Sequence, residues 1–434
     1  MKRLSAAAAV LTLFFTLAFP PGSARAGLPA NMKSYKTPYY VMYTDIEPDD
    51  AREAFIRMTK MAEEYHERTK SFSGIIKQRL PFYLFKNAND YYAADGPPGS
   101  AGVFTGKELM AITGEKSGLM TWHVVQHEGF HQFAHAVIGD TNMPIWVNEG
   151  LAEYFGESIF TGDGFVTGVI PPDRLARVRK EIDAHAVKSI KGMMLLSHEE
   201  WNGALSIINY DQAWSMVQFL AHGEEGKYQA AFSNFMKLIS ANKPWQKAWQ
   251  ESFGDAAGFE QKWREYLGKL DENPTRELYV RATTATLTSY LARAVAQKQT
   301  FDSFDEFLTA ADAGNLKMNS EDWLPPSLLK NAVAQAKHSK SVTFTLEAEA
   351  KKPPTLVATM EDKTRLVGAF TLRAGRIGAV GVDVDPMGKF IEQARQLIKD
   401  SKSAEARALL NKSLSQHPKS PLAADAKKLL SEAK

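Results

Sequence analysis

The sequence contains no cysteine among its 434 residues. A disulfide framework, a catalytic thiol and a lipid-modified N-terminal cysteine are therefore excluded. A metal site in this chain must use histidine or carboxylate ligands.

Excess charge of either sign is also missing. The formal net charge is +2, and three of the positive charges are Lys2, Arg3 and Arg25 in the N-terminal segment; without them the balance is −1 (2 − 3). The composition therefore gives no electrostatic basis for binding nucleic acid or an anionic membrane.

Long apolar runs are confined to the N-terminus. Lys2 and Arg3 precede an apolar stretch centred on residues 11–19, and Ala24-Arg25-Ala26 has the small-x-small form of a signal peptidase site. We expect residues 1–26 to be a signal peptide that is cleaved before Gly27. The mature chain would be a soluble periplasmic or secreted protein without a membrane span.

The remaining composition is that of a globular protein, with 44% hydrophobic and 24% charged residues. The length suggests about two to four folding units. Periodicity and turn residues predict a small α/β layer first, with strands at 39–44 and 80–85, helices at 48–69 and 89–94, and a strand–turn–strand at 103–113. Helices then follow at 121–137, 146–155, 210–222, 227–240 and 259–270.

The C-terminal third changes character twice. Residues 273–340 read as a helical segment and residues 341–386 as a β-rich segment with alternating apolar residues. Residues 387–434 are amphipathic and resemble a tetratricopeptide-type helical hairpin, which could dock a protein partner. We therefore predict an α+β fold in which residues 27–272 form one catalytic domain.

The pentapeptide His127-Glu128-Gly129-Phe130-His131 carries the chemistry. Residues four apart lie on one face of a helix, so both imidazoles can bind one ion. Glu128 lies one step around the helix, where a general base for a metal-activated water belongs.

A second acidic pair follows in Trp146-Val147-Asn148-Glu149-Gly150-Leu151-Ala152-Glu153-Tyr154-Phe155. Seventeen residues separate His131 from Glu149, which is enough for the chain to turn and return as an antiparallel helix. The turn residues are Gly139-Asp140-Thr141-Asn142 and Pro144. One of Glu149 and Glu153 can bind the ion while the other orients a histidine.

The motif resembles that of gluzincins, the zinc metallopeptidases that include thermolysin-like and aminopeptidase-N-like enzymes. The phrase Asn148–Phe155 is closer still to the peptidase-MA-like bacterial families. The resemblance implies a zinc ion held by His127, His131 and Glu149, Glu128 as general base, and Glu153 as the acid that orients a ligand. It also implies an oxyanion-stabilising tyrosine on a later helix, and Tyr210 is the matching candidate.

The amine-recognition string of the aminopeptidase-N group, Gly-x-Met-x-Asn, is absent, which argues against aminopeptidase activity. Residues 103–113 stand in its place, where an edge strand could pair with an extended peptide. We interpret His123 and His135, which extend the i+4 series, as rim or supporting residues because no base follows them within a second pentapeptide.

These features predict an exported zinc metallopeptidase acting on peptides or proteins. Two alternatives stay open: an exported interaction protein with a structural or silent metal site, and a zinc amidase acting on cell-wall peptides.

Overall fold

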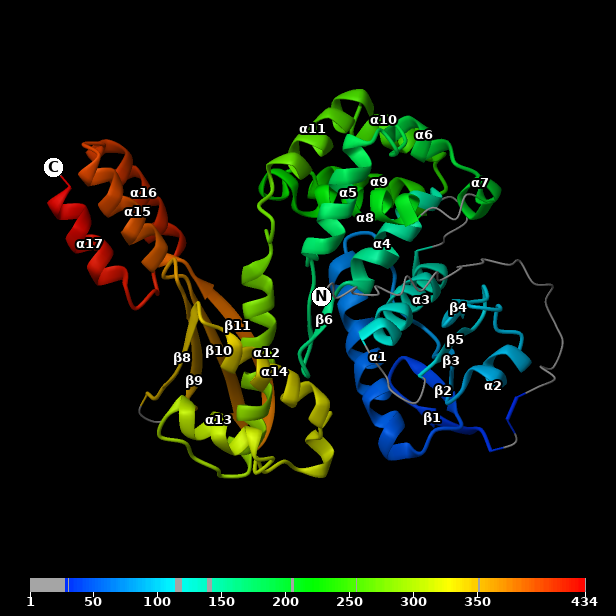
Figure 1. Cartoon of the computed structure of the whole chain (residues 1–434), viewed down its shortest axis with the longest axis horizontal. Helices are drawn as coiled ribbons and strands as arrows, with labels where there is room; N and C mark the ends of the chain where they lie inside the picture. Colours follow the sequence, from blue (N-terminus) through cyan, green and yellow to red (C-terminus); the bar gives the residue numbers. More distant parts are fainter. Residues whose placement is uncertain are drawn as a thin grey trace, which may run out of the picture. The chain divides into compact units, whose positions relative to one another are not determined.

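A computed structural model describes residues 28–29, 31–113, 119–138, 143–203, 207–254, 256–349 and 352–433. The predicted signal peptide and the predicted turn residues 139–142 lie outside these ranges. The chain divides into two compact units, one of Met1–Ile159 with Thr167–Thr275 and one of Phe160–Val166 with Arg276–Lys434 (Figure 1). The elements confirm the predicted mixed α+β class.

The first unit begins with a five-stranded sheet in the order β1-β2-β3-β5-β4. Its strands are β1 (Lys33–Lys36), β2 (Tyr40–Thr44), β3 (Leu80–Phe85), β4 (Gly102–Phe104) and β5 (Leu109–Ile112). β2, β3 and β5 are parallel, whereas β1 and β4 pair antiparallel at the two edges. The predicted strand–turn–strand is thus confirmed, with Gly106 at its turn in a left-handed conformation (φ 83°).

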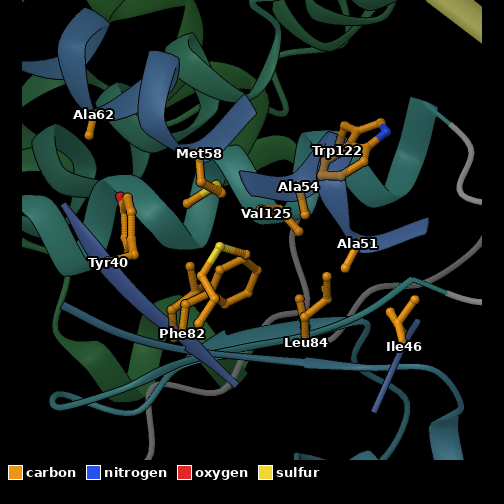
Figure 2. Packing of buried hydrophobic residues seen from close by; sticks show 13 residues of the cluster. Tyr40, Ile46, Ala51, Ala54, Met58, Ala62, Phe82, Leu84, Trp122 and Val125 are labelled. Carbon is orange, nitrogen blue, oxygen red and sulfur yellow. The ribbon is translucent and has the colours of Figure 1, made fainter. Parts of the chain in front are cut away.

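Strand alternation builds two hydrophobic faces on this sheet. Phe82, Leu84 and Leu109 point to the face that packs against α1 (Pro48–Thr69) and the start of α3 (Leu119–Val137), as Figure 2 shows for the labelled residues of this core. Their neighbours Phe85 and Met110 point to the opposite face, which α2 (Ala88–Ala93) covers. This packing anchors α3 beside the edge strand β4.

Helices make up the rest of the first unit. They are α4 (Ile145–Gly156), α5 (Pro172–Asp183), α6 (Ile190–Leu195), α7 (His198–Gly203), α8 (Ile207–Gly226), α9 (Gln229–Ser240), α10 (Trp245–Ser252) and α11 (Ala256–Lys269). α8 is interrupted where Gly223, Glu224 and Glu225 leave the helical conformation. α4 packs mainly against α3 and α8.

The second unit is built on a four-stranded antiparallel sheet in the order β11-β10-β9-β8. Its strands are β8 (Val342–Glu347), β9 (Thr355–Met360), β10 (Arg365–Arg373) and β11 (Arg376–Asp385). α12 (Arg276–Ala296) packs on β9, β10 and β11. The same unit contains α13 (Phe304–Asp312), the 3₁₀ turn η1 (Ser320–Asp322) and α14 (Pro326–His338). A separate two-stranded sheet is formed by β6 (Ile159–Phe160) and β7 (Phe165–Val166).

The chain ends in α15 (Met387–Lys399), α16 (Ser403–Gln416) and α17 (Ala423–Glu432), which share a core of Ile391, Ala394, Ala406, Leu410 and Ala426. The likeness of this segment to a tetratricopeptide hairpin stays a prediction. Among the described residues, no helix combines the length and apolar character that crossing a bilayer requires.

Candidate metal centre

α3 presents His127 and His131 on one buried face. Their Nε2 atoms lie 3.1 Å apart, and the two side chains are 0% and 6% exposed. The helical i+4 spacing alone produces this convergence.

α4 brings Glu149 to the same point. Its Oε2 atom lies 3.3 Å from Nε2 of His127 and 3.4 Å from Nε2 of His131. Zinc–ligand bonds of about 2.0–2.1 Å in a tetrahedral arrangement place ligand atoms about 3.3 Å apart. Oε2 of Glu149 is also buried without a hydrogen bond of good geometry to any described residue. The three residues could therefore hold a metal ion, and their donor set fits zinc.

The pairings show that α3 and α4 are antiparallel, because His131 meets Asn148 and Glu149 whereas His123 meets Glu153 and Glu157. Gln126 joins the helices: its Nε2 donates to the last two carbonyl oxygens of α4 at 3.0 Å and to that of Ser158, just beyond the helix, at 3.1 Å. A helix end buried in this way needs such donors.

Each histidine of this triad has a partner on its other ring nitrogen. Nδ1 of His127 lies 3.0 Å from Oε1 of Glu153, and Nδ1 of His131 lies 3.2 Å from Oδ1 of Asn148. A carboxylate or amide oxygen at Nδ1 keeps the proton there and leaves Nε2 to bind metal. Glu153 therefore lies beside Nδ1 of His127, and Asn148 is a partner to which sequence reasoning gave no role.

A charged cluster lies behind Glu153. Arg174 of α5, 6% exposed, contacts Glu153 at 2.7 Å, Glu157 at 2.7 Å and Asp211 of α8 at 2.8 Å. Sequence reasoning missed Arg174 because α5 was not predicted, and it missed Asp211, which lies in the predicted helix at 210–222, because its partner was unknown. The sequence signal for α5 was the proline at its first turn, Pro172.

Glu128 lies beside the triad and against the edge strand. It is 4% exposed, and the backbone N–H of Phe104 in β4 donates to its Oε2 at 2.7 Å. Thr105 N donates inward to Glu108 O, just before β5, and alternation along the strand turns the amide of Phe104 to the free edge. The carboxyl group of Glu128, the general-base candidate, therefore lies against the open edge of the sheet at Phe104.

Tyr210 stands near the start of α8. Its ring centroid lies 6.4 Å from that of His127 and 5.2 Å from that of Trp201, which meets it edge-on. Burial and the charge of Glu149 raise the pKa of Tyr210 well above 10, so the phenol stays protonated and can donate a hydrogen bond.

The outer histidines differ from each other. His123 lies 3.5 Å from Oε2 of Glu153, and it forms a second group of possible metal ligands with His127 and Glu153. Arg174 already contacts the same carboxylate, which disfavours a second cation there. The His135 side chain is exposed, with its ring 5.5 Å from that of Phe104.

The buried acids and imidazoles shift one another's pKa values. Burial opposes protonation of His127, but Glu149 and Glu153 outweigh it and raise the pKa to about 10. Burial likewise opposes ionisation of Glu149, but His131 and His127 lower its pKa to about 2. Burial raises the pKa of Glu128, and the nearby Glu149 adds to this. The site therefore attracts positive charge, which protons or a metal ion can supply.

Residues 122–246 are similar to a family whose description is "Protein of unknown function (DUF1570)". This segment contains the two histidines, the acids of α3 and α4, Arg174 and Tyr210. No curated protein matches the chain.

Proposed function

We propose that the first unit is a zinc-dependent peptide hydrolase. The observation that carries the proposal is the convergence of His127, His131 and Glu149 beside the buried carboxyl group of Glu128. Catalytic zinc sites combine three such ligands with an adjacent base.

A bound zinc ion would supply an acidified water and polarise a carbonyl oxygen. Glu128, buried beside these residues, would accept a proton from the water and pass it to the leaving amine. Tyr210 donates its hydroxyl proton in a hydrogen bond to the developing oxyanion.

A peptide is the substrate class that the edge strand supports best. The amide of Phe104 shows that the free edge of β4 faces Glu128. An extended peptide that pairs with this edge brings its own amides to the base, and backbone pairing accepts many sequences. Export from the cytoplasm belongs to the proposal and rests on the N-terminal pattern of residues 1–26.

The test combines metal analysis with one isosteric substitution. Purified protein should contain about one zinc ion per chain, and a broad peptide library should be cleaved unless a chelator is present. Glu128→Gln should keep the zinc and lower kcat by about 10²–10⁴-fold, because it removes a proton acceptor that is not a ligand. A wild type without stoichiometric zinc would overturn the proposal.

One observation favours a structural metal site as the second candidate. The ligands His127, His131 and Glu149 are at most 7% exposed. A closed site would bind zinc, lose stability with a chelator and cleave no peptide. Cleavage of cell-wall peptides alone would instead identify an amidase.

A further inference from the structure

The guanidinium of Arg174 joins three helices around the candidate metal centre. It lies on α5 and contacts Glu153 and Glu157 at the end of α4, together with Asp211 on α8. Its carbon also lies 4.6 Å from the centroid of the Trp214 ring. Trp214 and Asp211 are each 1% exposed, so the cation is enclosed by protein on these sides.

Glu153 is the point where this cluster reaches the metal ligands. One of its oxygens contacts Nδ1 of His127 at 3.0 Å, and the other contacts Arg174 at 2.7 Å. A carboxylate held at both oxygens cannot rotate about its terminal bond. The ring of His127 is thereby kept in one orientation and one tautomer.

Through Asp211, the same arginine also contacts α8, the helix that carries Tyr210. It accepts from Nε of Arg174 at 2.8 Å and directly follows Tyr210 in α8. The arginine therefore ties the helix of Tyr210 to the helix of Glu149. The fork of a guanidinium can hold several carboxylates at once, which an ammonium cannot do with the same geometry.

We propose that Arg174 is a positioning residue of the metal centre, which acts through Glu153 to set the zinc affinity of His127. The inference rests on the metal site of the proposed function, although it does not require peptide hydrolysis. Partners of metal ligands change metal affinity by about 10–100-fold when they are altered.

The experiment measures zinc dissociation constants by competition with a chelating dye. Arg174→Lys should weaken zinc binding about tenfold or more. Arg177→Lys is the matched control, because Arg177 also contacts Asp211 from α5 but is 38% exposed. It should stay within about twofold of the wild type. Far-UV circular dichroism and melting of the metal-free proteins check the fold.

A spectroscopic signal separates orientation from a general loss of stability. In the zinc-loaded protein, Arg174→Lys should shift the Nδ1 proton and nitrogen resonances of His127. Those of His131 should stay in place, because Asn148 holds that ring. Equal zinc affinity in the Arg174 and Arg177 variants, with unchanged His127 resonances, would overturn the inference.

A charge-balanced pair keeps the test valid where Arg174→Lys does not fold. Arg174→Gln/Glu153→Gln removes both charges together and should match the zinc affinity of Glu153→Gln alone, because the arginine acts through that carboxylate. A much larger loss of zinc affinity in the double variant than in Glu153→Gln would contradict the inference that Arg174 acts through Glu153. A wild type that binds no zinc overturns the metal site and this inference together, whereas zinc binding without cleavage overturns the peptidase alone.

Discussion

At the residue scale, the geometry of the candidate metal centre depends on the groups that hydrogen-bond to its histidines as much as on the histidines themselves. His127 and His131 are oriented by different groups, a carboxylate in Glu153 and a neutral amide in Asn148. An ionised partner binds an imidazole N–H more strongly than an amide does. Removing the partner of His127 should therefore lower zinc affinity more than removing the partner of His131.

Asn148→Ala leaves Nδ1 of His131 without its 3.2 Å partner. Zinc affinity should fall about tenfold, measured by dye competition. Gln132→Ala is a suitable control, because this neighbouring amide of α3 donates to Pro81 of the sheet at 2.8 Å. It should lower stability without changing zinc affinity. Equal zinc losses in both variants would contradict the assignment of Asn148.

Glu181 of α5 should make stability depend on pH. Burial, together with the charge of Asp211, raises its pKa from 4.5 to about 7. Between these values the folded state binds more protons than the unfolded state, so stability falls as pH rises from 4.5 to 7. Glu181→Gln removes this loss.

The melting temperature of Glu181→Gln should equal that of the wild type near pH 4.5. It should exceed the wild-type value by about 2 °C or more at pH 8. Melting curves across this range give the comparison. A difference that does not change with pH would show that Glu181 is not the group responsible.

At the element scale, two glycines allow the helices of the site to approach. A Cβ atom on Gly129 would lie 3.0 Å from the hydroxyl of Tyr65 in α1, and one on Gly150 would lie 2.5 Å from the carbonyl oxygen of Ala213 in α8. The first glycine lies inside the histidine motif, and the second follows Glu149. Their small size is therefore a packing requirement that accompanies the chemistry.

Gly150→Ala should destabilise the first unit by about 1–3 kcal/mol, because the backbone of α8 cannot yield without shifting Tyr210 and Asp211. Chemical denaturation measures the change. Gly268→Ala in α11 is the matched control, since no described residue outside its own helical backbone lies within 4 Å of its added Cβ atom. It should stabilise by about 0.5–1 kcal/mol. A neutral Gly150 variant would mean that α4 and α8 can separate freely.

Most of the long, strongly patterned elements were predictable, although α5, with 12 residues, was missed. β3, α1, α3 and α4 lie within a few residues of their predicted bounds, because apolar periodicity over two or more turns reflects a buried face. α6, α7 and α10 have only six to eight residues and were missed. Short helices owe their stability to tertiary packing, which leaves little local pattern.

At the scale of the whole molecule, the second unit combines two stretches of the sequence. The short stretch Phe160–Val166 packs with Arg276–Lys434, although more than 100 residues separate them in the chain. Asp163, between β6 and β7, accepts from Nη1 and Nη2 of Arg293 in α12 at 2.8 and 3.0 Å. Arg293 is 6% exposed. The unit is therefore discontinuous in sequence and depends on a pair 130 residues apart.

Asp163→Ala should leave the buried guanidinium of Arg293 without its carboxylate. The amides of α12 should lose about 1–3 kcal/mol of protection, measured by hydrogen exchange. Asp312→Ala removes the exposed pair with Lys337 in the same unit and should cost less. Equal exchange in both variants would contradict a structural role for the Asp163–Arg293 pair.

The sequence by itself determined the pattern of candidate metal ligands. His127, Glu128 and His131 are placed by helical spacing alone, and the turn back to Glu149 needs only a short connection. Only the tertiary structure decided what surrounds them. The amide of Phe104, the guanidinium of Arg174 and Asp211 come from elements distant in the chain. Local periodicity reports which face of a helix is buried, but the partner of a buried charge is chosen by packing between elements, which no local pattern records.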